Sequence, residues 1–328
     1  MRLLSLIPVL LLAMAPMPAA AQSPAQAPQK AEPRRWSEGD DTLRVNIIDL
    51  SPRFLDFHAA ASAAGVDAEQ RWTLWQQRYG FAAVPPTPEG QAMARRMLEQ
   101  AWPRYAGALP LIRRGAKAMR PQPLDTLRAV AAVLEPREPV EVDVVAYVGA
   151  FDGNAFSSGQ DGRPTVALPL EMDERQREAI LPHEMTHAVH IVTADLSGGW
   201  ERSIAATLMQ EGLATHVAHE VVPDRPLAEL IEYTPGWWAE VQPKRRGILQ
   251  AILPALEAKD GDTVFRFTMG KGPNGFEREA YAAGWWVIEH LRRQGMSLAE
   301  IARIPEAEMP AVARRAIEQM LAGSEPGS

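Results

Sequence analysis

The sequence contains no cysteine in its 328 residues, and this absence limits the chemistry open to the protein. Disulfide bonds, cysteine nucleophiles, thiolate metal sites and lipid attachment to a cysteine are all excluded. Any bound metal ion must therefore be held by histidine, aspartate or glutamate side chains.

Positive charge is also scarce. The chain carries 34 Lys and Arg residues against 41 Asp and Glu residues, a formal net charge of −7 at pH 7, and it has no long basic run. Nucleic-acid binding and adhesion to anionic membranes both require a concentrated positive surface. We therefore expect neither as a partner, and the composition makes no prediction about the oligomeric state.

Long hydrophobic runs are missing except at the N-terminus, where a largely apolar stretch of 13 residues from Leu3 to Ala15 follows Arg2. A membrane-spanning helix needs about 20 apolar residues, so this stretch is too short to be one. A charged start, a short apolar segment and an alanine-rich end are typical of a cleavable secretory signal peptide. We predict cleavage after Ala21, a periplasmic or secreted location and no stable membrane insertion.

The rest of the chain is predicted to divide into four regions: a flexible leader at 22–35, a helical N-terminal region at 36–136, a catalytic core at 137–222 and a helical C-terminal lobe at 223–328. The leader is rich in Pro, Gln and Ala and has no hydrophobic period. Asp67 and Thr87 are side chains of the kind that cap helix starts. Pro103 and Pro110 are expected to break the following segment into short helices.

A change of hydrophobic period marks the start of the predicted core. From Val140 to Val148 apolar residues alternate with Glu141, Asp143 and their neighbours, which is the pattern of a half-buried strand. The segment from Thr165 to Leu170 reads as a second strand. We therefore predict a small sheet in an otherwise helical chain, which is an α+β fold.

The strongest chemical signal is the sequence His183-Glu184-Met185-Thr186-His187, an HExxH motif. On a helix, residues four apart lie on the same face, so both imidazoles can point at one metal ion. Glu184 projects to one side of that face, where its carboxylate can act as a general base on water. Two buried, hydrogen-bonded histidines are the alternative to a zinc site.

A zinc site also needs a third protein ligand, and Glu211 follows in the segment Gln210-Glu-Gly-Leu-Ala214. This segment resembles the third-ligand helix of gluzincin metallopeptidases, and is most similar to bacterial families described as predicted zinc-dependent proteases. The resemblance extends over residues 140–303. It implies one Zn²⁺ held by His183, His187 and Glu211, Glu184 as general base, and Gly212 as the point where this helix approaches the HExxH helix.

The same resemblance raises candidates for supporting roles. Several relatives have an aspartate four residues after the ligand glutamate to orient a ligand histidine, where this chain has Thr215. His216 and His190 are further candidates for holding the ligands in place, although His190 lies a turn too far along its helix to complete a tetrahedral site. Tyr281 opens a C-terminal helix as in those proteases, and is expected either to donate to a developing oxyanion or to pack in the core.

Substrate binding is expected just before the metal helix, because in zincins a strand there pairs with an extended peptide. This implies a substrate strand within residues 147–158, with contacts at Tyr147, Asn154 and Ala155. The small side chains of Gly153, Ala155 and Ser157 leave room there for a second backbone. Together these inferences predict a zincin-like, exported zinc metallopeptidase with a peptide or protein substrate. The alternatives are a catalytically inactive envelope binding or assembly protein, and a zinc amidase acting on a non-protein amide.

Overall fold

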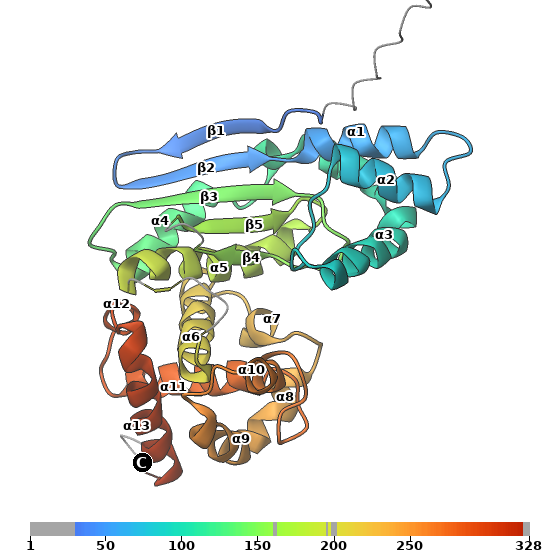
Figure 1. Ribbon diagram of the computed structural model, residues 1–328. Helices are drawn as coiled ribbons and strands as arrows, with labels where there is room; N and C mark the ends of the chain where they lie inside the picture. The colour runs from blue at the N-terminus through green and yellow to red at the C-terminus, as the bar shows by residue number, and fades with distance from the viewer. Residues whose placement is uncertain (1–29, 160–162, 195, 198–201, 324–328) are drawn as a thin grey trace, which may run out of the picture.

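The structure is a computed structural model that describes residues 30–159, 163–194, 196–197 and 202–323. The predicted signal peptide, most of the predicted leader and the last five residues lie outside the described residues. Figure 1 shows an upper part that contains the sheet and a lower part built from helices, with helix α6 running between them.

A five-stranded mixed sheet forms the centre of the upper part, in the order β1-β2-β3-β5-β4. Its strands are β1 (Arg34–Gly39), β2 (Leu43–Asp49), β3 (Val140–Tyr147), β4 (Phe156–Ser158) and β5 (Thr165–Pro169). Strands β2, β3 and β5 run parallel, while β1 and β4 are antiparallel to their neighbours. With helices making up most of the remaining elements, the α+β prediction is confirmed.

Residues 36–49 were expected to be helical, and this prediction is wrong. They lie in a hairpin, β1 and β2, whose turn is held by Asp40: its Oδ1 atom accepts the backbone N–H groups of Thr42 and Leu43 at 2.8 and 3.0 Å. Along β2, Val45 and Ile47 are buried while their neighbours are half-buried, which is a strand alternation. The hairpin joins the predicted core, because β2 pairs with β3 across the boundary predicted at residue 136.

Helices α4 (Pro123–Leu134) and α5 (Glu174–Ala194) pack side by side on one face of this sheet. The buried residues of β3 alternate with exposed or half-buried ones. On the other face Asn46 donates from its side-chain amide to Glu141 and Asp143, at 2.7 and 2.9 Å. One face is therefore apolar and covered by helices and the other is polar, as is usual for a sheet with helices on one side.

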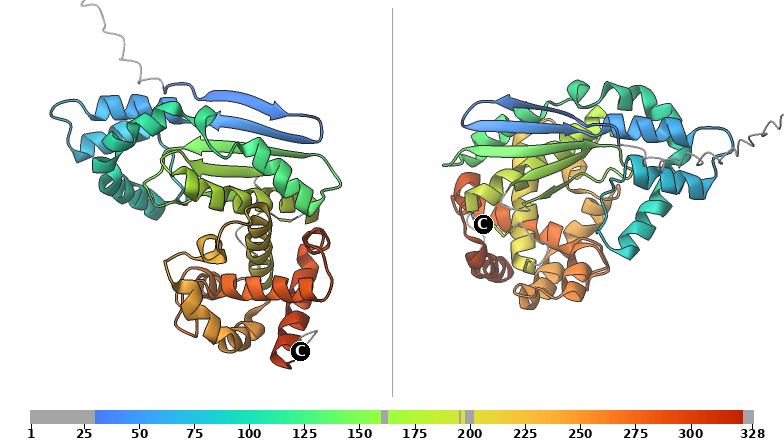
Figure 2. Two further views of the ribbon diagram at one scale, coloured as in Figure 1. Left: turned by 180° about the vertical axis from the view of Figure 1, so that it is seen from behind. Right: turned by 45° about the horizontal axis from the view of Figure 1, so that its top comes forward.

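Three helices extend from the end of the sheet where β2 and β3 finish (Figure 2): α1 (Ser51–Ala61), α2 (Ala68–Arg78) and α3 (Pro88–Arg114). Asp67 and Thr87 cap α2 and α3 through their side chains, as predicted. Pro103 and Pro110 do not divide the chain, because both lie inside α3. A helix of this length loses few of its backbone hydrogen bonds to two prolines, and its buried face compensates.

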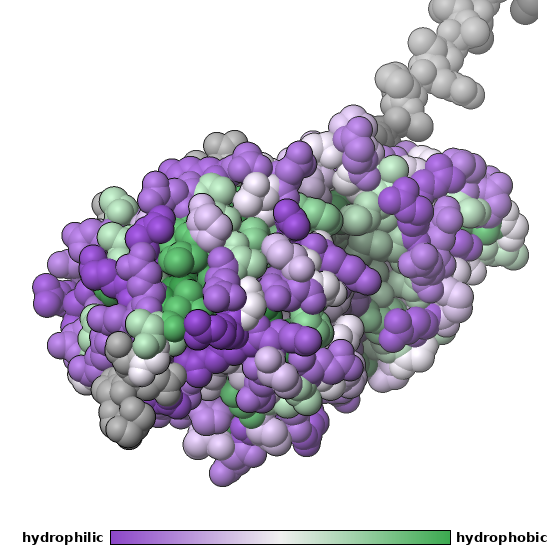
Figure 3. Space-filling model, turned by 90° about the horizontal axis from the view of Figure 1, so that it is seen from below, coloured by the Kyte–Doolittle hydropathy of each residue, from purple (hydrophilic) through white to green (hydrophobic). Residues whose placement is uncertain are grey.

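The lower part contains α6 (Ile204–Val221) and the helices that surround it. These are α7 (Leu227–Ile231), α8 (Trp237–Val241), α9 (Arg245–Ile252), α10 (Gly261–Thr268), α11 (Glu279–Arg293), α12 (Leu298–Ala302) and α13 (Met309–Leu321). The last three confirm the helical segments that the sequence predicts at 280–294, 298–303 and 310–321. Seen from below, this end of the molecule is mostly hydrophilic with apolar groups in between (Figure 3). Within the described ranges, no helix is both long and apolar enough to cross a membrane.

Helices α6 and α11 cross with their backbones in close contact. A Cβ atom on Gly212 would lie 2.9 Å from the Cα atom of Gly284 and closer still to its carbonyl oxygen. Gly212 was expected to face the HExxH helix, and this prediction is wrong, because it faces α11. Only glycine allows such an approach of two helix backbones.

Candidate metal centre

Helix α5 carries the HExxH motif and is continuous through Pro182. Asp173 and Gln176 close its first turn reciprocally: each side chain accepts the backbone N–H of the other, at 3.2 and 2.8 Å. Proline removes one backbone donor from a helix. The carbonyl of Pro182 gains a second partner, since Thr186 donates its hydroxyl to it at 2.8 Å.

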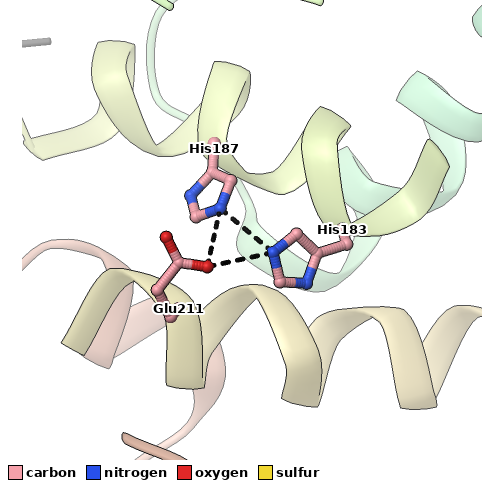
Figure 4. Close-up of side chains that lie close together, drawn as sticks. All are labelled: His183, His187 and Glu211. Atoms are coloured by element: carbon pink, nitrogen blue, oxygen red, sulfur yellow. Dashed lines mark hydrogen bonds and ion pairs between the residues drawn. The ribbon is translucent and has the colours of Figure 1, made fainter. Parts of the chain in front are cut away.

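Three buried side chains from two helices converge beside the sheet. His183 and His187 come from successive turns of α5, and Glu211 comes from α6, which packs against α5 (Figure 4). The two Nε2 atoms lie 3.2 Å apart, and the Oε2 atom of Glu211 lies 3.2 Å from that of His183 and 3.5 Å from that of His187. The structure thus brings together the three residues expected to bind the metal.

The spacing of these atoms fits a zinc ion. Zinc binds imidazole nitrogen and carboxylate oxygen at about 2.0–2.2 Å with tetrahedral geometry, so neighbouring ligand atoms lie about 3.3 Å apart. The three observed separations, 3.2, 3.2 and 3.5 Å, match the edges of such a tetrahedron. Two imidazoles and one carboxylate also form the donor set that catalytic zinc sites use, and a fourth position remains for water or substrate. Within the described residues this triad is the group that could hold a metal ion.

Arg202 fixes the orientation of Glu211. Its Nη2 atom lies 3.2 Å from Oε1 of Glu211, and its Nη1 atom donates to Gln210 at 2.6 Å. Because Oε1 is engaged by Arg202, Oε2 turns toward the histidines. The sequence analysis missed Arg202, since no motif marks it, and it can be related to Glu211 only once the start of α6 after Ser203 is known.

Electrostatics within the triad favour a charged carboxylate. Burial raises the pKa of Glu211, but the neighbouring imidazoles of His187 and His183 outweigh this effect and hold the pKa well below its usual value. Burial lowers the pKa of His187, and the carboxylate of Glu211 outweighs this effect, so the net pKa is raised. A carboxylate that stays ionised is suited to bind a cation.

The pKa of Glu184 is shifted in the opposite direction to that of Glu211. It is buried beside the triad, and burial raises its pKa despite the opposing effects of His183 and His187. Ser157, at the centre of β4, forms a side-chain hydrogen bond with it. A glutamate with a raised pKa is better matched to taking up and releasing a proton near neutral pH. Ser157 lies in the segment expected to bind substrate, but its contact with Glu184 was not predicted from the sequence.

Strand β4 lies at the edge of the sheet, beside α5. It pairs with β5 on one side, and no other described strand pairs with its second side. Asn154 and Ala155, two of the residues expected to contact substrate, lead directly into it. Tyr147 is 1% exposed and donates its hydroxyl to the carbonyl of Asn154. Tyr147 thus holds the backbone of this segment in place.

Two tyrosines from the N-terminal helices hold the chain just after β3. The hydroxyl of Tyr79 accepts the N–H of Val148 at 2.7 Å and donates to its carbonyl at 2.9 Å. The hydroxyl of Tyr105 donates to the carbonyl of Gly149 at 2.8 Å. Glu171 accepts the N–H of Gly149 at 2.9 Å. The N-terminal helices therefore fix the segment that leads from β3 to β4.

Tyr281, in the first turn of α11, is close enough to Glu211 for the charge of that carboxylate to affect its pKa. Burial raises its pKa, and the negative charge of Glu211 acts in the same direction. The guanidinium of Arg278 lies over its ring, 3.8 Å from the centroid, and forms a hydrogen bond with the phenol. A phenol that stays protonated is a neutral hydrogen-bond donor, as the expected role requires.

The remaining candidates, Thr215, His216 and His190, form no hydrogen bond with the imidazoles of His183 and His187. Thr215 donates its hydroxyl to the carbonyl of Glu211 at 2.9 Å, within its own helix. His216 stacks on Trp285 at a centroid distance of 3.7 Å, with Nε2 3.1 Å from its carbonyl oxygen, so it joins α6 to α11. These two are not holding a ligand imidazole. Burial lowers the pKa of His190 to about 3, and neither of its ring nitrogens has a partner among the described residues.

Comparison with known proteins adds one match. Residues 150–310 match the model of a family described as "Predicted Zn-dependent protease (DUF2268)". The matched segment contains the complete triad, Glu184 and Tyr281. No curated protein and no solved structure matches the chain. The chain is thus similar to a family of predicted zinc proteases, and its buried His183, His187 and Glu211 fit the metal that this description names.

Proposed function

We propose that the protein is a zinc-dependent metallopeptidase in which Glu184 is the general base. The observation that carries this proposal is the triad of ligand atoms spaced for one tetrahedral ion, with a buried glutamate of raised pKa in the same helical turn. The description of the matching family supports the class of reaction.

A zinc ion in this site would act as a Lewis acid that polarises the scissile carbonyl and lowers the pKa of water. Glu184 takes the proton of the attacking water on its carboxylate and later delivers it to the leaving amine nitrogen. The hydrogen bond with Ser157 links this carboxylate to β4, the strand at the edge of the sheet. Tyr281 donates its phenolic proton in a hydrogen bond to the former carbonyl oxygen as negative charge develops there.

The peptide would bind as an added strand along β4. Its backbone N–H and C=O groups would pair with the side of β4 that faces away from β5. Because Ser157 of β4 is hydrogen-bonded to Glu184, a peptide on this strand passes directly beside the general base. Tyr79, Tyr105 and Tyr147 keep the approach to β4 rigid through their hydrogen bonds to the backbone.

Export is part of the proposal and is supported by the sequence of residues 1–21. Expression with the native N-terminus should yield a mature chain that starts at Gln22 in the periplasmic or culture fraction. Intact mass spectrometry of that fraction measures the cleavage position directly. A full-length chain retained inside the cell would contradict export without affecting the assignment of the metal site.

The variant Glu184→Gln tests the mechanism. It preserves the shape of the side chain and removes its basicity, so zinc content should stay at wild-type level while hydrolysis falls about 100-fold or more. The measurements are zinc by elemental analysis and cleavage of a denatured protein by mass spectrometry. Glu174→Gln, in the first turn of the same helix, is the matched control and should behave as wild type. Wild-type turnover by Glu184→Gln would show that the mechanism is wrong.

A further inference from the structure

Arg278 is a cation held next to the metal centre by the loop that precedes α11. Its neighbour Glu279 is fully buried and accepts backbone N–H groups of Asn274 and Phe276, at 2.8 and 3.3 Å. The ring N–H of Trp237 donates to the carbonyl of Glu277 at 3.0 Å. The residues on both sides of Arg278 are thereby fixed, and so is the direction in which its side chain leaves the backbone.

The backbone of Arg278 adopts a conformation that costs free energy. Its φ of 59° and ψ of 34° lie in the left-handed region, where side chains with a Cβ atom are disfavoured by about 1 kcal/mol or more. A glycine or asparagine would adopt this conformation at lower cost. The presence of arginine here indicates that the guanidinium has a use that offsets the strain.

Two aromatic rings flank the guanidinium. Its Cζ atom lies 3.8 Å from the ring centroid of Tyr281 and 5.3 Å from that of Tyr233. Tyr281 lies in the first turn of α11 near the metal ligands, while Tyr233, in the loop after α7, is 66% exposed. Arg278 therefore lies between the buried site and a solvent-exposed aromatic side chain. Its planar faces are occupied and one of its N–H groups bonds to the phenol of Tyr281, which leaves the remaining N–H groups at its edge for a ligand.

No carboxylate pairs with Arg278 among the residues that the structure describes. The nearby carboxylate, Glu211, is already engaged by Arg202 and the two histidines, and its charge reaches Arg278 only as a longer-range effect. Glu184 and Glu211 are balanced in formal charge by Arg202 and Arg278. A divalent ion in the triad would leave the site with a net positive charge, which favours an anionic ligand.

We propose that Arg278, flanked by Tyr281 and Tyr233, is a carboxylate-binding subsite, so that the substrates are peptides with a carboxylate close to the bond that is cut. This inference rests on the proposed peptidase function. The carboxylate is either the C-terminus of the peptide or an Asp or Glu side chain, since both present two oxygens to the fork of N–H groups.

The test measures binding rather than turnover. Zinc-loaded protein carrying Glu184→Gln is equilibrated by dialysis with two libraries of N-acetylated hexapeptides, one with free C-termini and one with C-terminal amides. Retained peptides are quantified by mass spectrometry. Enrichment of the free-acid library indicates recognition of a terminal carboxylate. Enrichment of Asp and Glu over Asn and Gln within the amidated library indicates recognition of a side chain.

A charge-assisted, two-pronged hydrogen bond should give about tenfold or greater preference for the carboxylate-bearing peptides. Adding Arg278→Met should reduce the preference to near one, and Arg278→Lys, which keeps the charge but loses the fork, should leave a smaller preference. Arg266→Met on α10 removes an exposed arginine from the same lobe and should change nothing. Thermal unfolding of each variant verifies folding, and Arg278→Lys carries the test if Arg278→Met is unfolded.

Equal retention of acidic and neutral peptides by the Glu184→Gln protein, or an unchanged preference in the folded Arg278 variants, would overturn the subsite. Cleavage of both libraries by the protein with native Glu184 reports separately on the proposed function. Cleavage without a preference for carboxylate-bearing peptides would support the peptidase function and contradict the subsite. A binding preference without any cleavage would support the subsite and contradict the peptidase function.

Discussion

Gly212 of α6 and Gly284 of α11 meet where their helices cross, with room for neither to carry a side chain. Glu211 precedes the first of these glycines, and Tyr281 lies three residues before the second. The crossing therefore places the first turn of α11, with Tyr281 and Arg278, next to the third metal ligand. Packing between two helices that lie outside the HExxH motif thus determines which groups face the motif.

Substitution of Gly212 by alanine should separate α6 from α11. The added methyl group would meet the backbone of Gly284, so we expect a loss of about 1–3 kcal/mol in the free energy of unfolding, measured by urea denaturation. Zinc affinity should also decrease, because Glu211 would shift with α6. Gly107→Ala in α3 is the control: no neighbour lies within 4 Å of the added atom, and alanine favours a helix interior. If both variants were equally stable, the close crossing would be refuted.

Removal of one histidine ligand should abolish stoichiometric zinc binding. We expect one zinc per wild-type chain, and well under one for His183→Ala or His187→Ala after dialysis, because two ligands remain. Elemental analysis with a protein assay gives the ratio. His219→Ala, on α6, controls for the loss of a histidine from a helix. Full occupancy in either ligand variant would disprove the assignment.

Arg202 is expected to tune metal affinity without binding the metal. Arg202→Met frees Oε1 of Glu211, so the carboxylate loses its fixed orientation and the dissociation constant for zinc should rise about 10- to 100-fold. Competition with a fluorescent zinc chelator measures this change. Arg202→Lys should retain part of the zinc affinity. Arg315→Met, at an exposed position on α13, should leave the zinc affinity unchanged. An unaltered zinc affinity in Arg202→Met would mean that the contact is incidental.

Tyr281→Phe deletes one hydroxyl and keeps the ring that stacks on Arg278. If the phenol donates to the developing oxyanion, kcat should fall about 100-fold while zinc content and melting temperature stay close to wild type. Steady-state kinetics on a cleavable peptide, with differential scanning fluorimetry, separates these quantities. A lower melting temperature with normal kcat per folded molecule would identify Tyr281 as a packing residue instead.

His216 should make the protein sensitive to acid. Burial lowers its pKa in the folded state to about 3, against an ordinary value of 6.5, so only the unfolded chain takes up a proton between these values. The free energy of unfolding should therefore fall as pH decreases from about 6.5 to 3, by up to about 1.4 kcal/mol per pH unit from this group. His216→Gln should flatten that slope, and His219→Gln controls for removing a histidine from the same helix. Parallel slopes for wild type and His216→Gln, from urea denaturation at several pH values, would contradict this account.

The parts of the site that depend on helix periodicity could be predicted from the sequence. His183, Glu184 and His187 lie within two turns of one helix, so their relative directions follow from the spacing alone. Glu211 required a resemblance, because its distance from the histidines depends on how α5 and α6 pack. The strands at 140–147 and 165–169 were also visible, since hydrophobic alternation is a local property.

The parts that depend on contacts between distant segments could not be predicted. Arg202, Ser157 and Arg278 carry no motif, and their roles appear only when α6, β4 and the loop before α11 meet beside the triad. Strand β1 is polar and lies at the edge of the sheet, so its sequence has little alternation to detect. In contrast, the sequence of β2 shows hydrophobic alternation, so a strand could have been predicted there instead of a helix.

The pairing of β3 with β5 also limits how far the chain can be truncated for expression. The segment that matches the protease family starts at residue 150, yet β3 ends at Tyr147 and provides the parallel neighbour of β5. A fragment trimmed to the matched segment would keep every metal ligand, but β5 would lose β3 and α5 would lose much of the apolar surface it covers. The exposed strand edge would then be open to pairing with other fragments. Expression trials should therefore begin near Lys30, which keeps the hairpin of β1 and β2 that pairs with β3.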